Sequence, residues 1–307
     1  DGTMMVEKLV ERPRHIEVQI LADGHGTVAT LFERECSLQR RHQKLVEEAP
    51  SPYVATRPEL WAEMAEASRR LARAAGYIGA GTVEFMVDEA SGEFYFLEVN
   101  ARLQVEHPVT EAVTGLDLVQ WQLRVAMGER LEIDPRLIVG DRSALVGHAV
   151  EVRVVAEDPA KGFMPSVGPI LAWVEPKAPG IRVDTGYGPG AEVPRFYDSL
   201  LAKVIGHAPT RTQALAKVRQ ALDDLHILGV KTSAGYSQDV LAHPEVQAGN
   251  LDTGFLGREF GAWSPGVPPV ELGAIVEAAR GSASSGGAEA ISTVGAWGLH
   301  DGFRNVR

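Results

Sequence analysis

Polar and apolar residues alternate near the start of the chain, and a helical spacing follows further on. Residues 15–21 alternate with a period of two, which predicts a strand. Turn residues at 23–26 predict a hairpin whose second strand covers residues 27–33. Residues 39–44 are polar and mostly basic, and they predict a loop. Apolar residues three and four positions apart between 57 and 75 predict an amphipathic helix.

A second hairpin is predicted by the segments 82–87 and 93–99, which flank turn residues. A helix that ends near Gly128 follows, and Asp134 with Pro135 marks a predicted domain boundary. Beyond it we expect four strands and then a helix, at residues 147–156, 169–174, 180–185, 199–206 and 210–225. This mixture of elements predicts the α+β fold class. After Gly257 the chain is rich in Pro, Gly and Ser, which predicts a linker.

Composition limits the classes of function. The 307 residues are 45% hydrophobic and 23% charged, which is ordinary for a globular chain of about two domains. The net charge of −11 argues against general nucleic-acid binding, which needs a basic surface. The single cysteine, Cys36, excludes an internal disulfide, and nothing marks its thiol as reactive. No apolar run approaches the ~20 residues of a membrane helix. We therefore expect no nucleic acid, no membrane and a reducing compartment such as the cytoplasm.

The most informative stretch of the chain is residues 98–108. If this stretch is extended, one face carries five polar side chains, those of Glu98, Asn100, Arg102, Gln104 and Glu106. A solvated edge strand would show the same alternation. Against that interpretation, residues 94–97 are continuously apolar and predict a buried strand.

These residue types suit phosphate chemistry. Glu98 and Asn100 offer hard oxygen ligands for Mg²⁺, and Glu84 on the partner strand of the hairpin can complete the metal site. Arg102 suits a small oxyanion, which leaves Glu106 as a candidate base.

The basic stretch at 39–44 is a second candidate site, although most basic loops are only solvated. Gln39 and His42 can donate hydrogen bonds to phosphate or ribose oxygens, and the Lys44 ammonium suits phosphate or bicarbonate. Plainer interpretations are available for two other residues. Arg153 fits a salt bridge at a strand edge, and His15 fits a capping or core histidine.

Several segments together resemble the ATP-grasp core of the biotin carboxylase family. They are Glu7-Lys8 with residues 13–19, residues 33–44 with 47–50, and residues 81–85, 98–107, 147–153 and 197–199. Their order and approximate spacing match the family from the N-terminus to about Phe255. The resemblance implies the C-terminal half of an ATP-grasp fold, followed by a biotin carboxylase C-terminal α+β subdomain.

The resemblance also implies a role for each matching residue. ATP would contact Glu7, Lys8, Val10, His15, Gln39, His42, Met86 and Leu97. Mg²⁺ or Mn²⁺ would bind Glu84, Glu98 and Asn100, and bicarbonate would bind Lys44, Arg102, Gln104 and Val105. The catalytic group would comprise Glu106, Arg102, Arg153 and Lys44. Within it, Glu106 would be the general base, and Arg153 would stabilise the enolate-like anion of biotin.

By the same resemblance, residues 1–135 would hold ATP, metal and bicarbonate, and residues 136–257 would form the C-terminal subdomain. Residues 258–307 would be a linker and the start of a domain that contacts a carboxyltransferase. This extension is similar to that of methylcrotonyl-CoA and geranyl-CoA carboxylase α subunits. The family's N-terminal domain, most of its lid and its biotinylation motif have no counterpart here, so we expect a fragment of a longer chain.

The leading hypothesis is therefore a biotin carboxylase, an ATP-dependent ligase within an acyl-CoA carboxylase. It would use MgATP and bicarbonate to carboxylate biotin on a separate carrier domain, by way of carboxyphosphate. Expected partners are the biotin carboxyl carrier domain, a carboxyltransferase β subunit and a second copy of the chain. The expected compartment is the bacterial cytoplasm, or the mitochondrial matrix in a eukaryote. Two alternatives stay open: a non-catalytic assembly or dimerisation fragment, and an ATP-grasp ligase of the carbamoyl-phosphate synthetase type.

Overall fold

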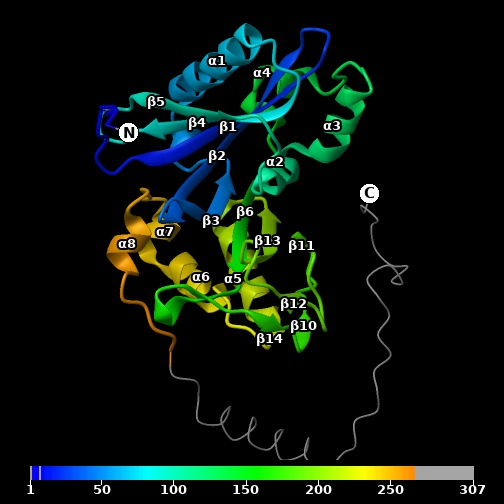
Figure 1. The fold of residues 1–307 in the computed structure, drawn as a ribbon. Helices are drawn as coiled ribbons and strands as arrows, with labels where there is room; N and C mark the ends of the chain where they lie inside the picture. The colour runs from blue at the N-terminus through cyan, green and yellow to red at the C-terminus, as the bar shows by residue number, and fades with distance from the viewer. Residues whose placement is uncertain (1, 7, 267–307) are drawn as a thin grey trace, which may run out of the picture. The chain divides into compact units, whose positions relative to one another are not determined.

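An eight-stranded antiparallel sheet runs through the part of the chain that the computed structural model describes, residues 2–6 and 8–266 (Figure 1). In order across the sheet, the strands are β11 (Ile181–Thr185), β13 (Leu200–Ala208), β6 (His148–Val155), β3 (Gln43–Ala49), β2 (Val28–Arg40), β1 (Arg14–Ala22), β4 (Gly79–Val87) and β5 (Phe94–Asn100). Three small two-stranded sheets pair β7 (Glu157–Asp158) with β8 (Met164–Pro165), β9 (Gly168–Pro169) with β12 (Glu192–Val193), and β10 (Ala172–Val174) with β14 (His226–Leu228).

Helices pack against both halves of this sheet. The α-helices are α1 (Pro58–Ala74), α2 (His107–Thr114), α3 (Leu118–Ala126), α4 (Pro135–Val139), α5 (Arg211–Asp224), α6 (Ala234–Ala242), α7 (Pro244–Ala248) and α8 (Phe255–Glu259). Short 3₁₀ turns cover Val54–Thr56, Arg142–Ala144 and Pro159–Lys161. Helices α1 and α4 contact β2, α3 contacts β4, and α5 contacts β6 and β13. Helix α2 contacts β2, β3, β6 and β13, so it lies beside the middle of the sheet.

The apolar faces of these elements form two main cores. In the first core, Trp61 and Met64 of α1 pack with Ile16 and Val18 of β1. Helix α1 begins at Pro58, whose missing N–H and fixed φ suit the first helical position. The second core joins β6 and β13 to α5 and α6 and includes Val204. No helix among the described residues is long and apolar enough to span a membrane.

The structure confirms the strand at 15–21, the hairpin at 82–99 and the helix at 57–75, and the mixed α+β class is correct. The loop predicted at 39–44 is wrong. Strand β2 continues to Arg40 and β3 begins at Gln43, so only Arg41 and His42 form the turn. Both turn residues have positive φ, 49° and 65°, as a tight hairpin requires.

The predicted extended segment from 98 to 106 is also wrong beyond Asn100, where β5 ends. The burial predicted for residues 94–97 fails as well, since Phe96 is 54% and Leu97 46% exposed. These side chains are exposed because β5 lies at the edge of the sheet. The strand predicted at 169–174 divides into the separate short strands β9 and β10.

One sheet continues across the predicted boundary at residue 135, because β6 pairs with β3. The described elements lie in one unit, residues 1–265. The division into three segments stays a prediction. From residue 267 onward, the segment predicted to contact a carboxyltransferase lies outside the described residues.

Candidate functional site

A row of charged residues crosses four neighbouring strands. Arg34 of β2 is opposite Glu17 of β1, Glu17 is opposite Glu84 of β4, and Glu84 is opposite Glu98 of β5. Directly opposite residues of paired strands place their side chains on the same face of the sheet. The strand register therefore gathers one guanidinium and three carboxylates that are far apart in the sequence.

Lys44 connects this row to the N-terminal end of α2. Its Nζ lies 2.5 Å from Glu17 Oε2, 2.9 Å from Glu84 Oε1 and 2.6 Å from Glu106 Oε1. The tight turn between β2 and β3 directs Lys44 here, because it pairs Lys44 with Gln39. One ammonium thus neutralises part of the charge of three buried carboxylates.

The charges in this cluster set its protonation. Burial alone would raise the pKa of Glu17, but the Lys44 ammonium and the Arg34 guanidinium outweigh it and lower that pKa to about 2. Burial also opposes ionisation of Glu84. Its contact with His15 and the charge on Lys44 prevail, so the pKa of Glu84 lies well below its usual value. Both carboxyl groups are therefore ionised at neutral pH.

Arg34 is completely buried and fixes the surrounding polar groups. It donates to Glu17 Oε1 at 2.5 Å and to Gln104 Oε1 at 3.0 Å, and further to hydroxyl and amide oxygens of Gln19, Thr82 and Thr110. Gln104 in turn donates to Glu84 Oε1 at 2.6 Å. No role was predicted for Arg34 or Glu17 from the sequence. Their only signal is a pair of charges at polar positions of two segments that otherwise alternate as strands.

Glu106 immediately precedes α2 and is 2% exposed. Its carboxylate lies between two cations: Lys44 on one oxygen, and Arg153 Nη2 at 3.0 Å on the other. The sequence predicted that Arg102 holds a small oxyanion beside Glu106, and this stays a prediction. In the structure, Arg102 donates to Asn100 Oδ1 and to the Leu103 carbonyl, because the chain turns away from the strand direction after Asn100.

Lys44, Glu84, Glu98, Glu106 and Arg153 line one cavity of about 640 Å³, whereas Glu17 and Arg34 are not part of its lining. Of the predicted site residues, the lining includes His15, Gln39, His42, Lys44, Glu84, Met86, Leu97, Glu98, Asn100, Arg102, Gln104, Val105, Glu106 and Arg153. Lys8 and Val10 are not part of the lining; Lys8 instead bonds to Tyr95 and lies 3.5 Å from Glu93. Glu7 lies outside the described residues. The lining also includes residues with no predicted role, among them Arg40, Glu157 and Phe163.

A metal ion would find oxygen ligands at the edge of this cavity. Asn100 donates its amide to Glu84 Oε1 at 3.1 Å and to Glu98 Oε1 at 3.0 Å, so the three predicted metal ligands lie together. Two carboxylates and an amide oxygen suit Mg²⁺ or Mn²⁺, and too few protein ligands are present for a closed cage. A nucleotide phosphate would complete such a site.

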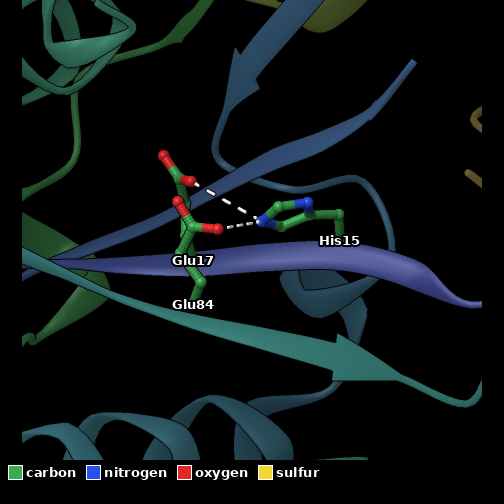
Figure 2. A group of neighbouring side chains, drawn as sticks. All are labelled: His15, Glu17 and Glu84. Atoms are coloured by element: carbon green, nitrogen blue, oxygen red, sulfur yellow. Dashed lines mark ion pairs between the residues drawn. The ribbon is translucent and has the colours of Figure 1, made fainter. Parts of the chain in front are cut away.

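A second group of possible ligands lies deeper. Figure 2 shows the carboxylates of Glu17 and Glu84 turned toward the His15 ring, whose Nε2 is 2.8 Å from Glu84 Oε2. The ligand atoms of these three residues lie within 4.8 Å of one another. The Lys44 ammonium already contacts both carboxylates, so a divalent ion there would meet a cation at close range. We therefore interpret this group as an ion-pair cluster.

Two further residues complete the description of the site. Lys203 of β13 donates to the Val105 carbonyl at 3.0 Å and holds the backbone at a predicted bicarbonate contact. No sequence pattern pointed to it.

Cys36 is fully buried, and burial raises the pKa of its thiol well above the usual value, which agrees with an unreactive side chain.

Comparisons with known proteins identify the family of the chain. The family described as "Carbamoyl-phosphate synthase L chain, ATP binding domain" matches residues 1–134, and "Biotin carboxylase C-terminal domain" matches residues 151–258. The chain is 44% identical over 282 residues to the mitochondrial methylcrotonoyl-CoA carboxylase subunit alpha of Mus musculus, covering 92% of this chain and 38% of that protein. It is 46% identical over 251 residues to the biotin carboxylase of Nostoc sp., covering 82% of this chain and 54% of that protein.

A solved structure shows the same fold. The biotin carboxylase domain of the Hydrogenobacter thermophilus 2-oxoglutarate carboxylase, a dimer in complex with MgADP, ADP and bicarbonate, matches with a TM-score of 0.80 and 42% identity. The match covers 85% of this chain and 56% of that one. The chain thus spans roughly half or less of the length of these relatives. With an ATP-binding domain followed by a biotin carboxylase C-terminal domain, the chain belongs to the biotin carboxylase family of ATP-grasp proteins.

Proposed function

We propose that this chain supplies the ATP-, metal- and bicarbonate-binding part of a biotin carboxylase that carboxylates biotin on a carrier domain. One observation carries the proposal: Glu106 lies between Lys44 and Arg153 on the wall of a cavity that also contains Glu84 and Glu98. A base beside two cations, next to a pair of metal-binding carboxylates, is suited to activating a small anion toward a nucleotide phosphate.

In this reaction Glu106 removes the proton of bicarbonate, and the resulting oxygen nucleophile attacks the γ-phosphorus of ATP. The products are carboxyphosphate and ADP. Lys44 and Arg102, with the Gln104 amide and the Val105 backbone, hold bicarbonate beside Glu106. His15, Gln39, His42, Met86 and Leu97 contact the nucleotide. Glu84, Glu98 and Asn100 would hold a Mg²⁺ ion, which when bound would neutralise charge on the phosphates.

Carboxyphosphate then breaks down to CO₂ and phosphate, and the phosphate takes the N1′ proton of biotin. The Arg153 guanidinium stabilises the enolate-like biotin anion, whose N1′ attacks CO₂. This second half-reaction requires the biotin carboxyl carrier domain, and transfer onward requires a carboxyltransferase β subunit. The similar proteins include a carboxylase subunit, which supports the two partners. They also include a biotin carboxylase dimer, which supports a second copy of the chain as a partner. The acyl-CoA acceptor is set by the carboxyltransferase.

The match to a biotin carboxylase C-terminal domain favours this function over a carbamoyl-phosphate synthetase. An assembly fragment without catalysis is the remaining alternative. Isothermal titration of the 307-residue chain with MgATP separates them. We expect binding by the wild type, weaker binding by Glu98→Gln and unchanged binding by the exposed control Glu192→Gln. Absence of binding by the wild type would favour the assembly fragment.

A further inference from the structure

Two buried carboxyl groups that the proposed reaction does not use lie next to Arg153. Glu47 of β3 and Glu151 of β6 are directly opposite in the strand register, and both are completely buried. Glu47 Oε1 accepts a hydrogen bond from Arg153 Nε at 2.5 Å. Neither Glu47 Oε2 nor the two oxygens of Glu151 have a hydrogen-bond partner among the described residues.

The surrounding charges treat the two carboxyl groups differently. The charges that affect the pKa of Glu47 include those of Arg153 of β6, Lys44 of β3 and Glu106 before α2. The charges that affect the pKa of Glu151 include those of Arg153, Lys203 of β13 and Glu106. Of these two carboxyl groups, only Glu47 is in ion-pair contact with a cation of the described residues. Lys203 instead binds the Val105 carbonyl and Asp184. Two neighbouring carboxylates in the interior do not both ionise readily. The group without a cation contact is the one that retains the proton.

We propose that Glu151 stays protonated and that ionised Glu47 is a positioning residue, which holds the Arg153 guanidinium between itself and Glu106. This inference rests on the proposed function, in which Arg153 acts on biotin. Arg153 lines the cavity, so the N–H groups that Glu47 and Glu106 do not use stay available to a ligand. The anchor at Nε fixes the orientation of the guanidinium plane toward the cavity.

The protonation of the pair supports this arrangement. Burial raises the pKa of Glu151 well above its usual value, and the Glu47 charge raises it further. Burial also raises the pKa of Glu47, to about 7, although Arg153 opposes this effect. Glu47 therefore gains a proton as the pH falls through about 7, and its hold on Arg153 weakens.

The matched variants Glu47→Gln and Glu151→Gln test the inference in a full-length carboxylase chain that contains this region. We expect Glu47→Gln to lower the turnover of free biotin by about 10-fold or more, since a charge-assisted hydrogen bond is lost. Biotin-independent, bicarbonate-dependent ATP cleavage should change less than about twofold, since Lys44 and Glu106 keep their contact. Glu151→Gln should preserve both reactions, because a neutral amide imitates a protonated carboxyl group. The wild type should lose biotin turnover below pH 7, and Glu47→Gln should lack this step.

Equal damage by the two variants, or normal biotin turnover in Glu47→Gln, would overturn the inference. A wild type inactive in both reactions would instead count against the proposed function. Nuclear magnetic resonance of the 307-residue chain then tests the positioning role of Glu47 independently of activity. The Arg153 Nε–H resonance, assigned by its absence in Arg153→Lys, should resist solvent exchange at pH 8. That protection should persist in Glu151→Gln and disappear in Glu47→Gln. Protection that persists in Glu47→Gln, or that is absent from the wild type, would refute the positioning role.

Discussion

Lys44 is the cation on which the charge balance of the site depends, and replacing it with methionine tests that balance. Met retains an apolar stem of similar length but removes the ammonium from Glu17, Glu84 and Glu106. The pKa of Glu17 is lowered from an ordinary 4.5 to about 2. At roughly 1.4 kcal/mol per unit, this corresponds to about 3 kcal/mol, which Lys44 shares with Arg34. Loss of one partner from a buried ion pair costs about 3–5 kcal/mol. We therefore expect Lys44→Met to reduce the free energy of unfolding by about 3 kcal/mol at pH 7.5.

The destabilisation should depend on pH in a defined direction. A carboxyl group whose pKa is depressed by folding adds stability above its unfolded pKa of about 4.5, and this stability is lost as the pH falls toward 2. The difference between wild type and Lys44→Met should therefore shrink by roughly 1 kcal/mol for each pH unit below 4.5. Urea unfolding followed by tryptophan fluorescence at pH 7.5 and 3.5 measures both values, with the exposed Lys177→Met as control. A difference that is absent, or equal at the two pH values, would refute the reasoning.

Two further predictions concern the metal and biotin steps in the full-length enzyme. Glu98→Gln should raise the Mg²⁺ concentration needed for ATP cleavage by about 10-fold or more, because one of two carboxylate ligands is lost; an unchanged Mg²⁺ titration would remove Glu98 from the metal site. Arg153→Ala should reduce carboxylation of free biotin far more than bicarbonate-dependent ATP cleavage, because Lys44 still contacts Glu106; radiolabelled bicarbonate and ADP release measure the two rates, and equal losses would contradict this division of roles.

Local patterns in the sequence predicted much of the fold. The period-two alternation of β1 and the helical spacing of α1 follow directly from which side chains each element buries. The hairpin of β4 and β5 was also predictable, because turn residues separate two apolar segments. The exposure of Phe96 and Leu97 was not predictable, since an apolar run does not show whether a strand lies in the middle or at the edge of a sheet.

The candidate site was predicted in composition but not in its contacts. Glu84, Glu98 and Lys44 were found because their residue types suit phosphate chemistry and their segments resemble a known family. Buried charges such as Arg34 and Glu47 were missed, because a sequence pattern assigns charged residues to the solvent. Glu47 is buried where β3 pairs with the distant strand β6. Arg34 is buried among distant residues such as Thr82 and Gln104, and local spacing specifies neither environment.

The most direct test of the proposed activity is bicarbonate-dependent ATP cleavage by Glu106→Gln in the full-length enzyme. The amide is nearly isosteric with the carboxylate but cannot accept the bicarbonate proton. Removal of a general base reduces turnover by about 10²–10⁴-fold. We expect a loss of this size, with nucleotide affinity preserved because the predicted nucleotide contacts are other residues. Near-normal turnover in Glu106→Gln would show that the base lies elsewhere and would contradict the account.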